Sequence, residues 1–145
     1  KVTPTLLRRH EPMTGPRIMS ERVALDSVQM LRRVVTNGTA SMAKMDEYAI
    51  GGKTGTADKP RKGGGYYEDK VINTFASVFP TDAPQYVLLV TLDEPIDRTG
   101  PEVRRTAGWT AVPVAAEIVR RAAPLLGMRP AIAPQPLDGL TAVKQ

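Results

Sequence analysis

The stretch YAIGGKTGTA, residues 48–57, decides the fold, because it is the first of three strand-like runs that follow one another closely. The second run, residues 72–79, is rich in β-branched and aromatic side chains and ends at Pro80. The third run, residues 86–92, is followed by Asp93-Glu94-Pro95. Consecutive runs with short connections predict an antiparallel meander of three strands.

The two connections between these runs differ in composition. The segment KPRKGGGYY, residues 59–67, combines basic residues with three consecutive glycines, which predicts a mobile loop. The segment TDAP, residues 81–84, is short and rich in turn-forming residues, so it predicts a tight turn between the second and third strands.

A helix is predicted over residues 20–36. Ser20 is a favourable N-cap, and Glu21 in the first turn suits the positive end of the helix dipole. Asn37-Gly38 supplies a left-handed residue that ends the helix. The predicted buried face recurs at helical spacing and consists of Ala24, Val28, Leu31 and Val35, with Leu25 and Val34 at its margins.

A second helix is predicted over residues 112–126. Pro113 costs nothing in the first turn, and Gly127 lies just past the end. Pro124 should bend or fray the last turn. The predicted buried face consists of Val114, Ile118, Ala122 and Leu125.

Together these elements predict an α+β fold: an antiparallel sheet of about three strands with the two helices packed on one face. The length of 145 residues suits a single domain. We assign residues 1–127 to that domain, with residues 1–19 extended and irregular, and residues 128–145 to a proline-rich C-terminal tail.

Composition excludes several classes of protein. The absence of cysteine removes disulfides, thiolate zinc sites and a cysteine nucleophile, and the single histidine, His10, cannot build a metal site or a Ser-His-Asp relay. We therefore expect no metal and no cofactor. The net charge of +5 invites nucleic-acid binding, but acidic residues are interspersed with the basic ones and aromatics make up only 5%, so we expect none. No apolar run approaches the roughly 20 residues that cross a bilayer.

Two short motifs are set aside. Gly51-Gly52-Lys53-Thr54 looks like the end of a phosphate-binding loop, but that loop needs glycine where the sequence has Glu47. Ser41-Met-Ala-Lys44 matches the S-x-x-K pattern of serine acyl-transferases, in which the lysine takes the serine proton. That geometry needs a helix start, for which Gly38 and the nearby strand leave little room, so we interpret the match as chance.

Lys53-Thr54-Gly55 and the following Thr56 stand out because they lie on the first predicted strand. Period-two alternation places Thr54 and Thr56 on one face, where two hydroxyls could grip a carboxylate. Lys53 adds positive charge, and Gly55 lets a ligand lie against the backbone. In isolation the triplet is more typical of an ordinary surface strand, so the order of the surrounding elements decides its interpretation.

That order resembles the C-terminal part of a class B penicillin-binding protein, a peptidoglycan D,D-transpeptidase of the kind that acts in bacterial cell division. The resemblance covers roughly residues 3–127. It is carried by GKTGTA at 52–57, NTFAS at 73–77, YVLLV at 86–90 and DEP at 93–95, with PTLL at 4–7, SERV at 20–23, NGTA at 37–40 and WTAVPV at 109–114.

The resemblance implies a serine acyl-enzyme fold in which Lys53-Thr54-Gly55 is the third catalytic motif. Lys53 would support the serine of an S-x-N motif and attract the substrate carboxylate. Thr54 and Thr56 would bind the carboxylate of D-alanine or of a β-lactam, and the Thr56 N–H would be one of two oxyanion-hole donors. The loop at residues 63–67 would border the site, although it is equally typical of a plain surface hairpin.

The resemblance also implies what this sequence lacks. The nucleophile-bearing S-x-x-K and the S-x-N motif would lie upstream of residue 1, and none of the four serines is followed two positions later by asparagine. We expect this chain to be inactive alone, with the missing half of the domain or a second copy of the chain as its partner. The parent protein would face the periplasm, anchored in the inner membrane. The alternative is a binding or scaffolding module with the same fold.

Three further features are interpreted as structural. Asp93 and Glu94 are adjacent, so their side chains should face opposite ways at the end of a strand rather than act as a carboxylate pair. Trp109 is expected to be a packing anchor before the second helix rather than a substrate platform. The basic residues 59–62 are expected to be a solvated loop.

Overall fold

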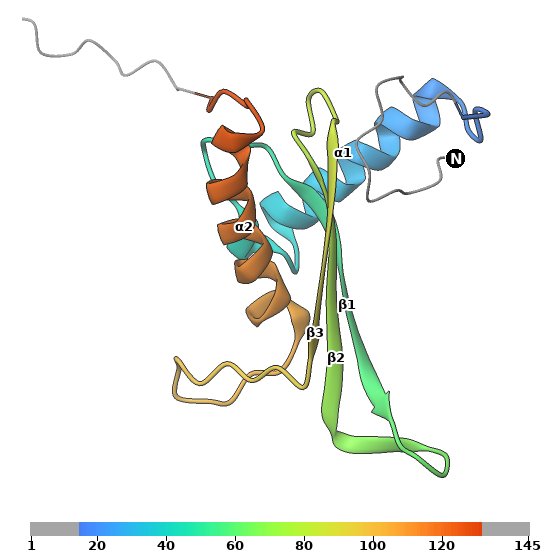
Figure 1. Cartoon of the computed structure of the whole chain (residues 1–145), viewed down its shortest axis with the longest axis vertical. Coiled ribbons are helices and arrows are strands. Elements are labelled where there is room, and N and C mark those ends of the chain that lie inside the picture. The colour runs from blue at the N-terminus through green and yellow to red at the C-terminus, as the bar shows by residue number, and fades with distance from the viewer. Residues whose placement is uncertain (1–14, 132–145) are drawn as a thin grey trace, which may run out of the picture.

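A computed structural model describes residues 15–131 of the chain. The sheet has three antiparallel strands in the order β1-β2-β3, and two helices flank it, which confirms the predicted α+β fold (Figure 1). The elements, in chain order, are α1 (Glu21–Asn37), the 3-10 turn η1 (Ser41–Ala43), β1 (Gly51–Pro60), β2 (Tyr66–Phe79), β3 (Tyr86–Asp93), the 3-10 turn η2 (Ala107–Trp109) and α2 (Ala111–Leu125).

One face of the sheet carries the core. Thr54 pairs with Phe75, which in turn pairs with Val90, so the register aligns the inward-facing positions of all three strands. Phe75 is fully buried, and Phe79 and Val90 are nearly so. The aromatic and β-branched residues of β2 therefore form a pleated surface against which the helices pack.

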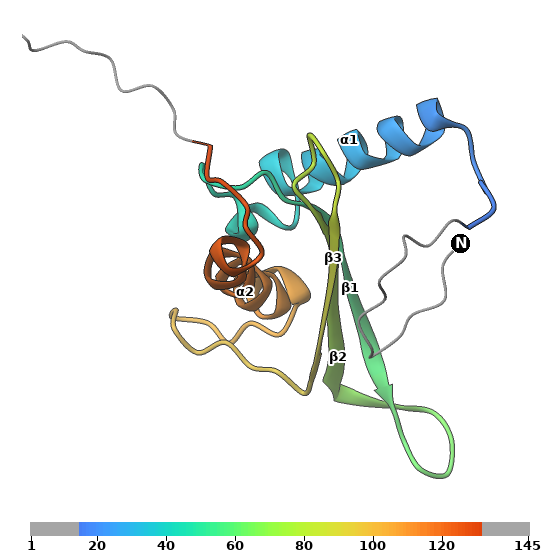
Figure 2. The ribbon, with the colours of Figure 1, turned by 45° about the horizontal axis from the view of Figure 1, so that its top comes forward.

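Helix α2 lies across this face (Figure 2). The predicted helix is confirmed, and Gly127 follows it in the left-handed conformation with φ of 75°. The predicted buried stripe was wrong, because Val114 and Ile118 are about two-fifths exposed and Leu125 is 88% exposed. The face that packs is instead rich in alanine, which lets the helix approach the sheet closely; it consists of Ala111, Val112, Ala115, Ala116, Val119 and Ala123.

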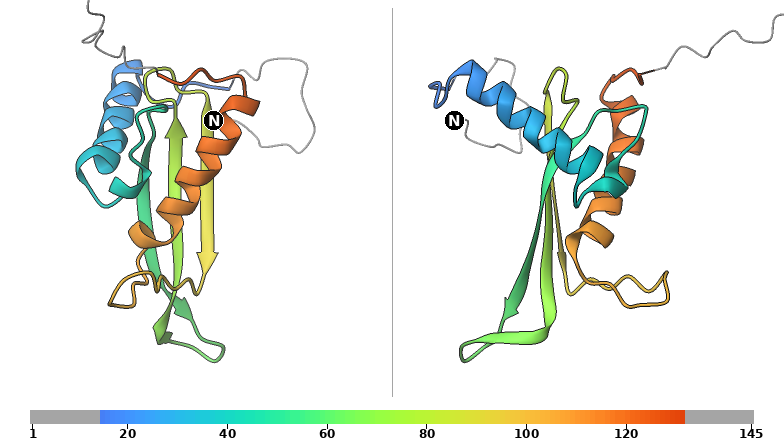
Figure 3. Two further views of the ribbon diagram at one scale, coloured as in Figure 1. Left: turned by 90° about the vertical axis from the view of Figure 1, so that its left-hand side faces the viewer. Right: turned by 180° about the vertical axis from the view of Figure 1, so that it is seen from behind.

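Helix α1 lies beside β1 at the edge of the sheet, and its N-terminal part extends on the side away from α2 (Figure 3), so the expectation that both helices pack on one face was wrong for this part of α1. Ser20 caps it as predicted, since the Ser20 hydroxyl accepts a hydrogen bond from the Val23 N–H at 3.3 Å. Val35, near the C-terminal end of α1, is fully buried and belongs to the core. Gly38 is extended with φ of −127°, so the expected left-handed ending was wrong. A side chain there would lie 2.9 Å from the Val34 carbonyl oxygen, so close packing is what requires glycine.

The β1–β2 hairpin is longer than the sequence predicts. Strand β1 starts at Gly51 rather than residue 48 and runs on to Pro60, and β2 already starts at Tyr66. The loop predicted over residues 59–67 is therefore reduced to residues 61–65. Its three glycines, residues 63–65, have φ values of 97°, 103° and 75°, which side-chain-bearing residues rarely adopt.

The other face of the sheet, which we call the open face, carries Lys53, Ala76, Val78, Val87 and Leu89. Val87 is 80% exposed and Leu89 63% exposed. Within residues 15–131, α2 lies on the opposite side of the sheet (Figure 3), and α1 meets the open-face side at the β1 edge, against Gly51. An exposed apolar surface of this kind on one face of a sheet is typical of a surface that another element covers.

Several expectations concern residues outside the described range. They are the extended segment before residue 15, His10, and the tail beyond residue 131. The first tail residues are described: Met128 packs against the core, and the Ala131 N–H donates to the Glu47 carbonyl oxygen at 2.8 Å. In the described part of the chain, neither helix has the length and apolar character needed to cross a membrane.

Candidate active site

The glycines before Lys53 allow β1 to pack closely on both sides. A Cβ atom on Gly51 would lie 2.9 Å from the Arg32 backbone nitrogen, so α1 rests directly on this strand. A Cβ atom on Gly52 would lie 2.5 Å from the Phe75 ring. These two close approaches fix the start of β1 between the helix and the core.

Thr54 and Thr56 lie on the same face of β1, as the alternation predicts. Both line a pocket of about 390 Å³ beside the strand. The pocket wall combines hydroxyls and backbone groups with one aromatic ring, and it contains no acidic side chain: Thr39, Ser41, Met42, Thr54, Thr56, Thr106, Ala107, Gly108 and Trp109. No charged carboxylate in this wall opposes an anion.

Both threonine hydroxyls are held by neighbours. The Ala107 N–H donates a hydrogen bond of 3.0 Å to Thr56 Oγ1. Because that hydroxyl oxygen accepts, its own hydrogen remains available as a donor. The Thr54 and Thr39 hydroxyl oxygens are 2.9 Å apart, so one donates to the other. A carboxylate only accepts hydrogen bonds, so it fits a site that offers the Thr56 hydrogen and, where Thr39 is the donor, the Thr54 hydrogen.

Lys53 and Gly55 do not join this hydroxyl face. Lys53 pairs with Ala76 and lies on the open face, and its Nζ atom donates to the Thr54 carbonyl oxygen at 2.7 Å. Gly55 is exposed, and a Cβ atom there would lie no nearer than 3.9 Å to other atoms of the described chain. Strand β1 is an edge strand, so the outer row of its backbone groups is left without a strand partner among residues 15–131.

Asn73 supports this pocket from the core, a role that sequence reasoning missed. Its side chain is fully buried, and its Nδ2 atom donates to the Arg105 carbonyl oxygen at 2.6 Å and to Thr110 Oγ1 at 2.7 Å. These two bonds hold both ends of the η2 turn, from which the Ala107 N–H reaches Thr56. The sequence signal that could have pointed to this role is the single amide side chain, that of Asn73, in the apolar run of β2. Asn73 Oδ1 has no hydrogen-bond partner within the described residues.

Trp109 is only partly a packing residue. The residue is 43% exposed and lines the pocket, and the Arg104 guanidinium carbon lies 3.7 Å from the Trp109 ring centroid in a cation–π contact. Asp97 pairs with Arg104 at 3.9 Å and accepts hydrogen bonds from the Thr99 hydroxyl and N–H. These bonds, those of Thr99 first, lower the pKa of the Asp97 carboxyl. The loop between β3 and η2 is thus internally braced beside the pocket.

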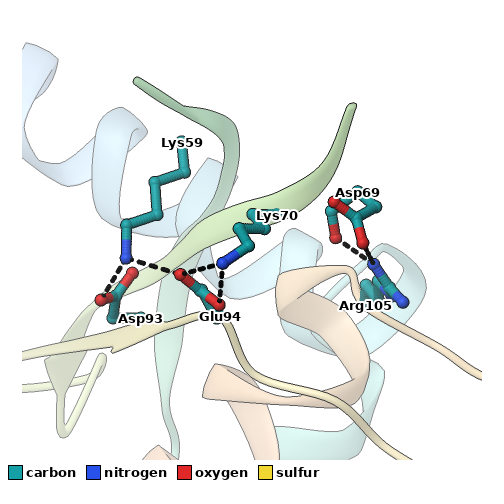
Figure 4. A network of polar contacts seen from close by, with 6 residues as sticks. All are labelled: Lys59, Asp69, Lys70, Asp93, Glu94 and Arg105. Carbon is teal, nitrogen blue, oxygen red and sulfur yellow. Dashed lines mark hydrogen bonds and ion pairs between the residues drawn. The ribbon is translucent and has the colours of Figure 1, made fainter. Parts of the chain in front are cut away.

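Asp93 and Glu94 converge on one cation, contrary to the expectation that they face apart. Lys59 Nζ lies 2.7 Å from Asp93 Oδ2 and 2.8 Å from Glu94 Oε1 (Figure 4). The reason is backbone geometry, because Glu94 has φ of 50° and leaves the strand alternation. Lys70 adds a second cation at 3.1 Å from Glu94. We call these four residues the hairpin latch.

The hairpin latch shifts two pKa values. Hydrogen bonds to Asp93, then to Glu94, raise the pKa of Lys59. Hydrogen bonds from Lys59, then from Lys70, lower the pKa of Glu94. Beside the hairpin latch, Arg105 contacts both the backbone carbonyl and the carboxylate of Asp69 (Figure 4). The basic segment at residues 59–62 is therefore partly engaged rather than wholly solvated.

Ser41 opens a short helical turn, η1, for which the sequence reading left little room. The turn is a single one, and Lys44 caps it through its backbone N–H rather than through its side chain. Ser41 lines the pocket, but no hydrogen bond joins its hydroxyl to Lys44 in the described structure. The residues described also contain no cluster of three His, Cys, Asp or Glu that could hold a metal ion.

The arrangement matches a known domain. The family model described as the penicillin binding protein transpeptidase domain matches residues 1–120. The chain belongs to this family. This transpeptidase-family chain is 38% identical over 117 residues to a peptidoglycan D,D-transpeptidase FtsI homologue of Chlorokybus atmophyticus. The alignment covers 80% of the chain and 16% of the relative. It is 31% identical to a probable FtsI of Caulobacter vibrioides, covering 89% and 24%.

Solved penicillin-binding proteins have the same fold. The transpeptidase domain of penicillin-binding protein 3 from Burkholderia pseudomallei has a TM-score of 0.71 at 34% identity and covers 88% of the chain. Penicillin-binding protein 3 from Mycobacterium tuberculosis, in complex with ampicillin, has a TM-score of 0.67 at 30% identity and covers 90%. The chain spans 37% and 30% of these two solved chains, so it corresponds to only part of the domain.

Proposed function

We propose that this chain is the carboxylate-binding part of a serine D,D-transpeptidase that cross-links peptidoglycan. The observation that carries the proposal is the pair of hydroxyls, Thr54 and Thr56, on one face of the edge strand of a transpeptidase-family sheet. Both hydroxyls can donate, and the pocket around them has no acidic wall. The ligand would be the terminal carboxylate of a peptidoglycan stem peptide, or the equivalent carboxylate of a β-lactam.

Lys53, Gly55 and the Thr56 backbone take the remaining roles at this strand. Lys53 lies on the open face, where it would support a serine supplied by the rest of the domain and attract the substrate carboxylate. The Thr56 N–H would be one oxyanion-hole donor, and Gly55 leaves the backbone accessible to the substrate. Removing one oxyanion-hole donor typically lowers kcat by about 10²–10³-fold.

The nucleophile would come from outside these 145 residues. The chain has no S-x-N triplet, and its four serines are Ser20, Ser27, Ser41 and Ser77. The chain also spans only 37% and 30% of the two solved chains. The exposed Val87 and Leu89 on the open face supply an apolar surface on which the missing half of the domain would pack. A second copy of this chain is the alternative occupant.

The names of the relatives support a proposal for the cellular setting. They include FtsI proteins and the stage V sporulation protein D of Bacillus subtilis, which is 33% identical over 129 residues. We infer an enzyme of septal peptidoglycan synthesis that is a target of β-lactams. It would be anchored in the inner membrane and would act on the periplasmic side.

A non-catalytic module of the same fold is the second candidate. It is favoured by the absence of the nucleophile motifs from this sequence. The two candidates differ in covalent labelling, because only an enzyme forms an acyl bond with penicillin. A module would bind β-lactams reversibly or not at all.

The test is labelling of the full-length protein with a fluorescent penicillin. Wild-type protein should be labelled covalently, and Thr54→Val with Thr56→Val should lower the second-order acylation rate constant at least about tenfold, since a hydrogen bond to a charged group is worth about 1.5–3 kcal/mol. Thr36→Val is the matched control, because its hydroxyl bonds only within and just at the end of α1. Absence of any label on the wild type would refute the enzyme and favour the module.

A further inference from the structure

Thr39 lies against the pocket on the link between α1 and η1. Its hydroxyl oxygen is 2.9 Å from Thr54 Oγ1. Its backbone carbonyl oxygen would lie 2.6 Å from a Cβ atom on Gly108, so the link and the η2 turn are in close contact. Thr39, Thr54 and Thr56 thus form three sides of one small pocket, contributed by segments that are distant in sequence.

The direction of the Thr39–Thr54 hydrogen bond determines what Thr54 can do. Each hydroxyl has one hydrogen and can accept as well as donate. If Thr39 donates to Thr54, the Thr54 hydrogen is free to point into the pocket. In the opposite direction that hydrogen is already used. A bound carboxylate accepts only, so it selects the first arrangement.

Thr56 shows the same arrangement with a fixed donor. The Ala107 N–H can only donate, and it donates to Thr56 Oγ1. The Thr56 hydrogen is therefore free whether or not a ligand is present. A donor from Thr39 gives Thr54 the equivalent state, and the two hydroxyls then point two hydrogens at one anion.

We propose that Thr39 is a positioning residue for carboxylate recognition: its hydroxyl donates to Thr54 and turns the Thr54 hydrogen toward the substrate carboxylate. This inference rests on the proposed function of the same site and adds a residue to it. The Thr39 side chain is exposed, so its hydroxyl is not needed to fill the core.

The experiment uses the full-length protein and two probes, a fluorescent penicillin with its free carboxylate and the methyl ester of that penicillin. Thr39→Val is nearly isosteric and removes the hydroxyl. Thr39→Ser keeps the hydroxyl, and Thr39→Ala removes it together with the methyl group of an exposed side chain. Thr36→Val applies the same change three residues earlier, where the hydroxyl donates to the Arg32 carbonyl oxygen.

Thr39→Val and Thr39→Ala should lower the acylation rate constant for the free acid about tenfold. Thr39→Ser should restore it to within about twofold of the wild type, and Thr36→Val should leave it unchanged. The ester should acylate the wild type more slowly than the free acid does. Thr39→Val should have the same rate constant for the ester as the wild type, because the ester lacks the anion that Thr39 helps to recognise. That selective loss would support the positioning role.

Two results would overturn the inference. Equal loss for the acid and the ester would make Thr39 a structural residue, and an unchanged rate for the acid would leave it with no role. Both keep the proposed function, provided the wild type is labelled. A wild-type protein that takes no label from the free acid would overturn the proposed function and the role of Thr39 together.

Discussion

The Ala107 N–H donates a hydrogen bond of 3.0 Å to the Thr56 hydroxyl, across 51 positions of sequence. This bond links the turn before α2 to the strand that carries the Lys53-Thr54-Gly55 triplet. Because the N–H can only donate, the Thr56 hydroxyl accepts from it and keeps its own hydrogen available to donate in the pocket. Whatever holds the η2 turn in place therefore affects the site as well as the core.

Asn73 is the residue that holds this turn. Asn73→Leu removes the two hydrogen bonds to Arg105 and Thr110 and should reduce the free energy of unfolding by about 1–3 kcal/mol. It should also slow acylation of the full-length protein by penicillin, because the η2 turn would lose its support. Urea unfolding and the acylation rate constant measure the two effects.

Ser77→Ala is the control for Asn73. Ser77 lies on the same face of β2 and its hydroxyl donates to the Leu88 carbonyl oxygen, away from the η2 turn. It should cost stability but leave acylation unchanged. If both variants slowed acylation in proportion to their loss of stability, Asn73 would have no specific effect on the site.

Gly52→Ala should destabilise the fold through overpacking. The added methyl group would meet the Phe75 ring at 2.5 Å and the Ala76 carbonyl oxygen at 2.6 Å, and such clashes typically cost about 1–3 kcal/mol. Gly55→Ala is the matched control for stability, since its Cβ atom would meet nothing closer than 3.9 Å. Equal melting temperatures for the two variants would contradict the close packing of β1 on the core.

The two faces of α2 should respond differently to truncation. Val119 is fully buried, so Val119→Ala should cost about 2 kcal/mol of unfolding free energy. Ile118 is 40% exposed, and Ile118→Ala should cost less than half as much in this chain. Chemical denaturation distinguishes them. A larger loss for Ile118→Ala would mean that the stripe read from the sequence, rather than the alanine-rich face, packs on the sheet.

The hairpin latch predicts a pH dependence of stability. The pKa of Glu94 is lowered, so its stabilising effect is present above the unfolded carboxyl pKa of about 4.3 and is lost as the pH falls through the lower folded value. The pKa of Lys59 is raised, so its effect is present below about 10.4 and is lost as the pH rises through the higher folded value. The latch should therefore operate across the neutral range.

Lys59→Met tests the latch. The stability gap between it and the wild type should be widest between about pH 5 and 10, should narrow outside that range, and should shrink with added salt because the groups are exposed. Lys62→Met is the matched control, because it removes a charge from the same hairpin and the residues described show no ion pair for Lys62. A gap independent of pH would indicate that Lys59 acts only by packing.

The order of elements could be predicted from the sequence because its signals are local. Ser20 caps α1 through a hydrogen bond to a residue three positions away, and Gly127 ends α2 through its own backbone conformation. The shared face of Thr54 and Thr56 follows from the alternation of a strand. Each of these features depends only on neighbours in sequence.

The remaining features depend on contacts between distant residues. The buried face of α2 is alanine-rich, so its hydrophobic signal is weaker than that of the exposed face with Ile118 and Leu125. The convergence of Asp93 and Glu94 on Lys59 depends on one positive φ angle at Glu94. The Asn73 hydrogen bonds join β2 to Arg105 and Thr110, which lie 32 and 37 positions later in the sequence, and no short motif carries such a link.

The most direct test of the central claim is the site of acylation in the full-length protein. Intact mass after incubation with penicillin, followed by peptide mapping, identifies the modified residue. We predict one adduct, on a serine outside these 145 residues, and no adduct on this chain by itself. An adduct on Ser41 or any other serine of this chain, or no adduct at all on the full-length protein, would contradict the proposal that this chain supplies carboxylate binding to a nucleophile held elsewhere in the domain.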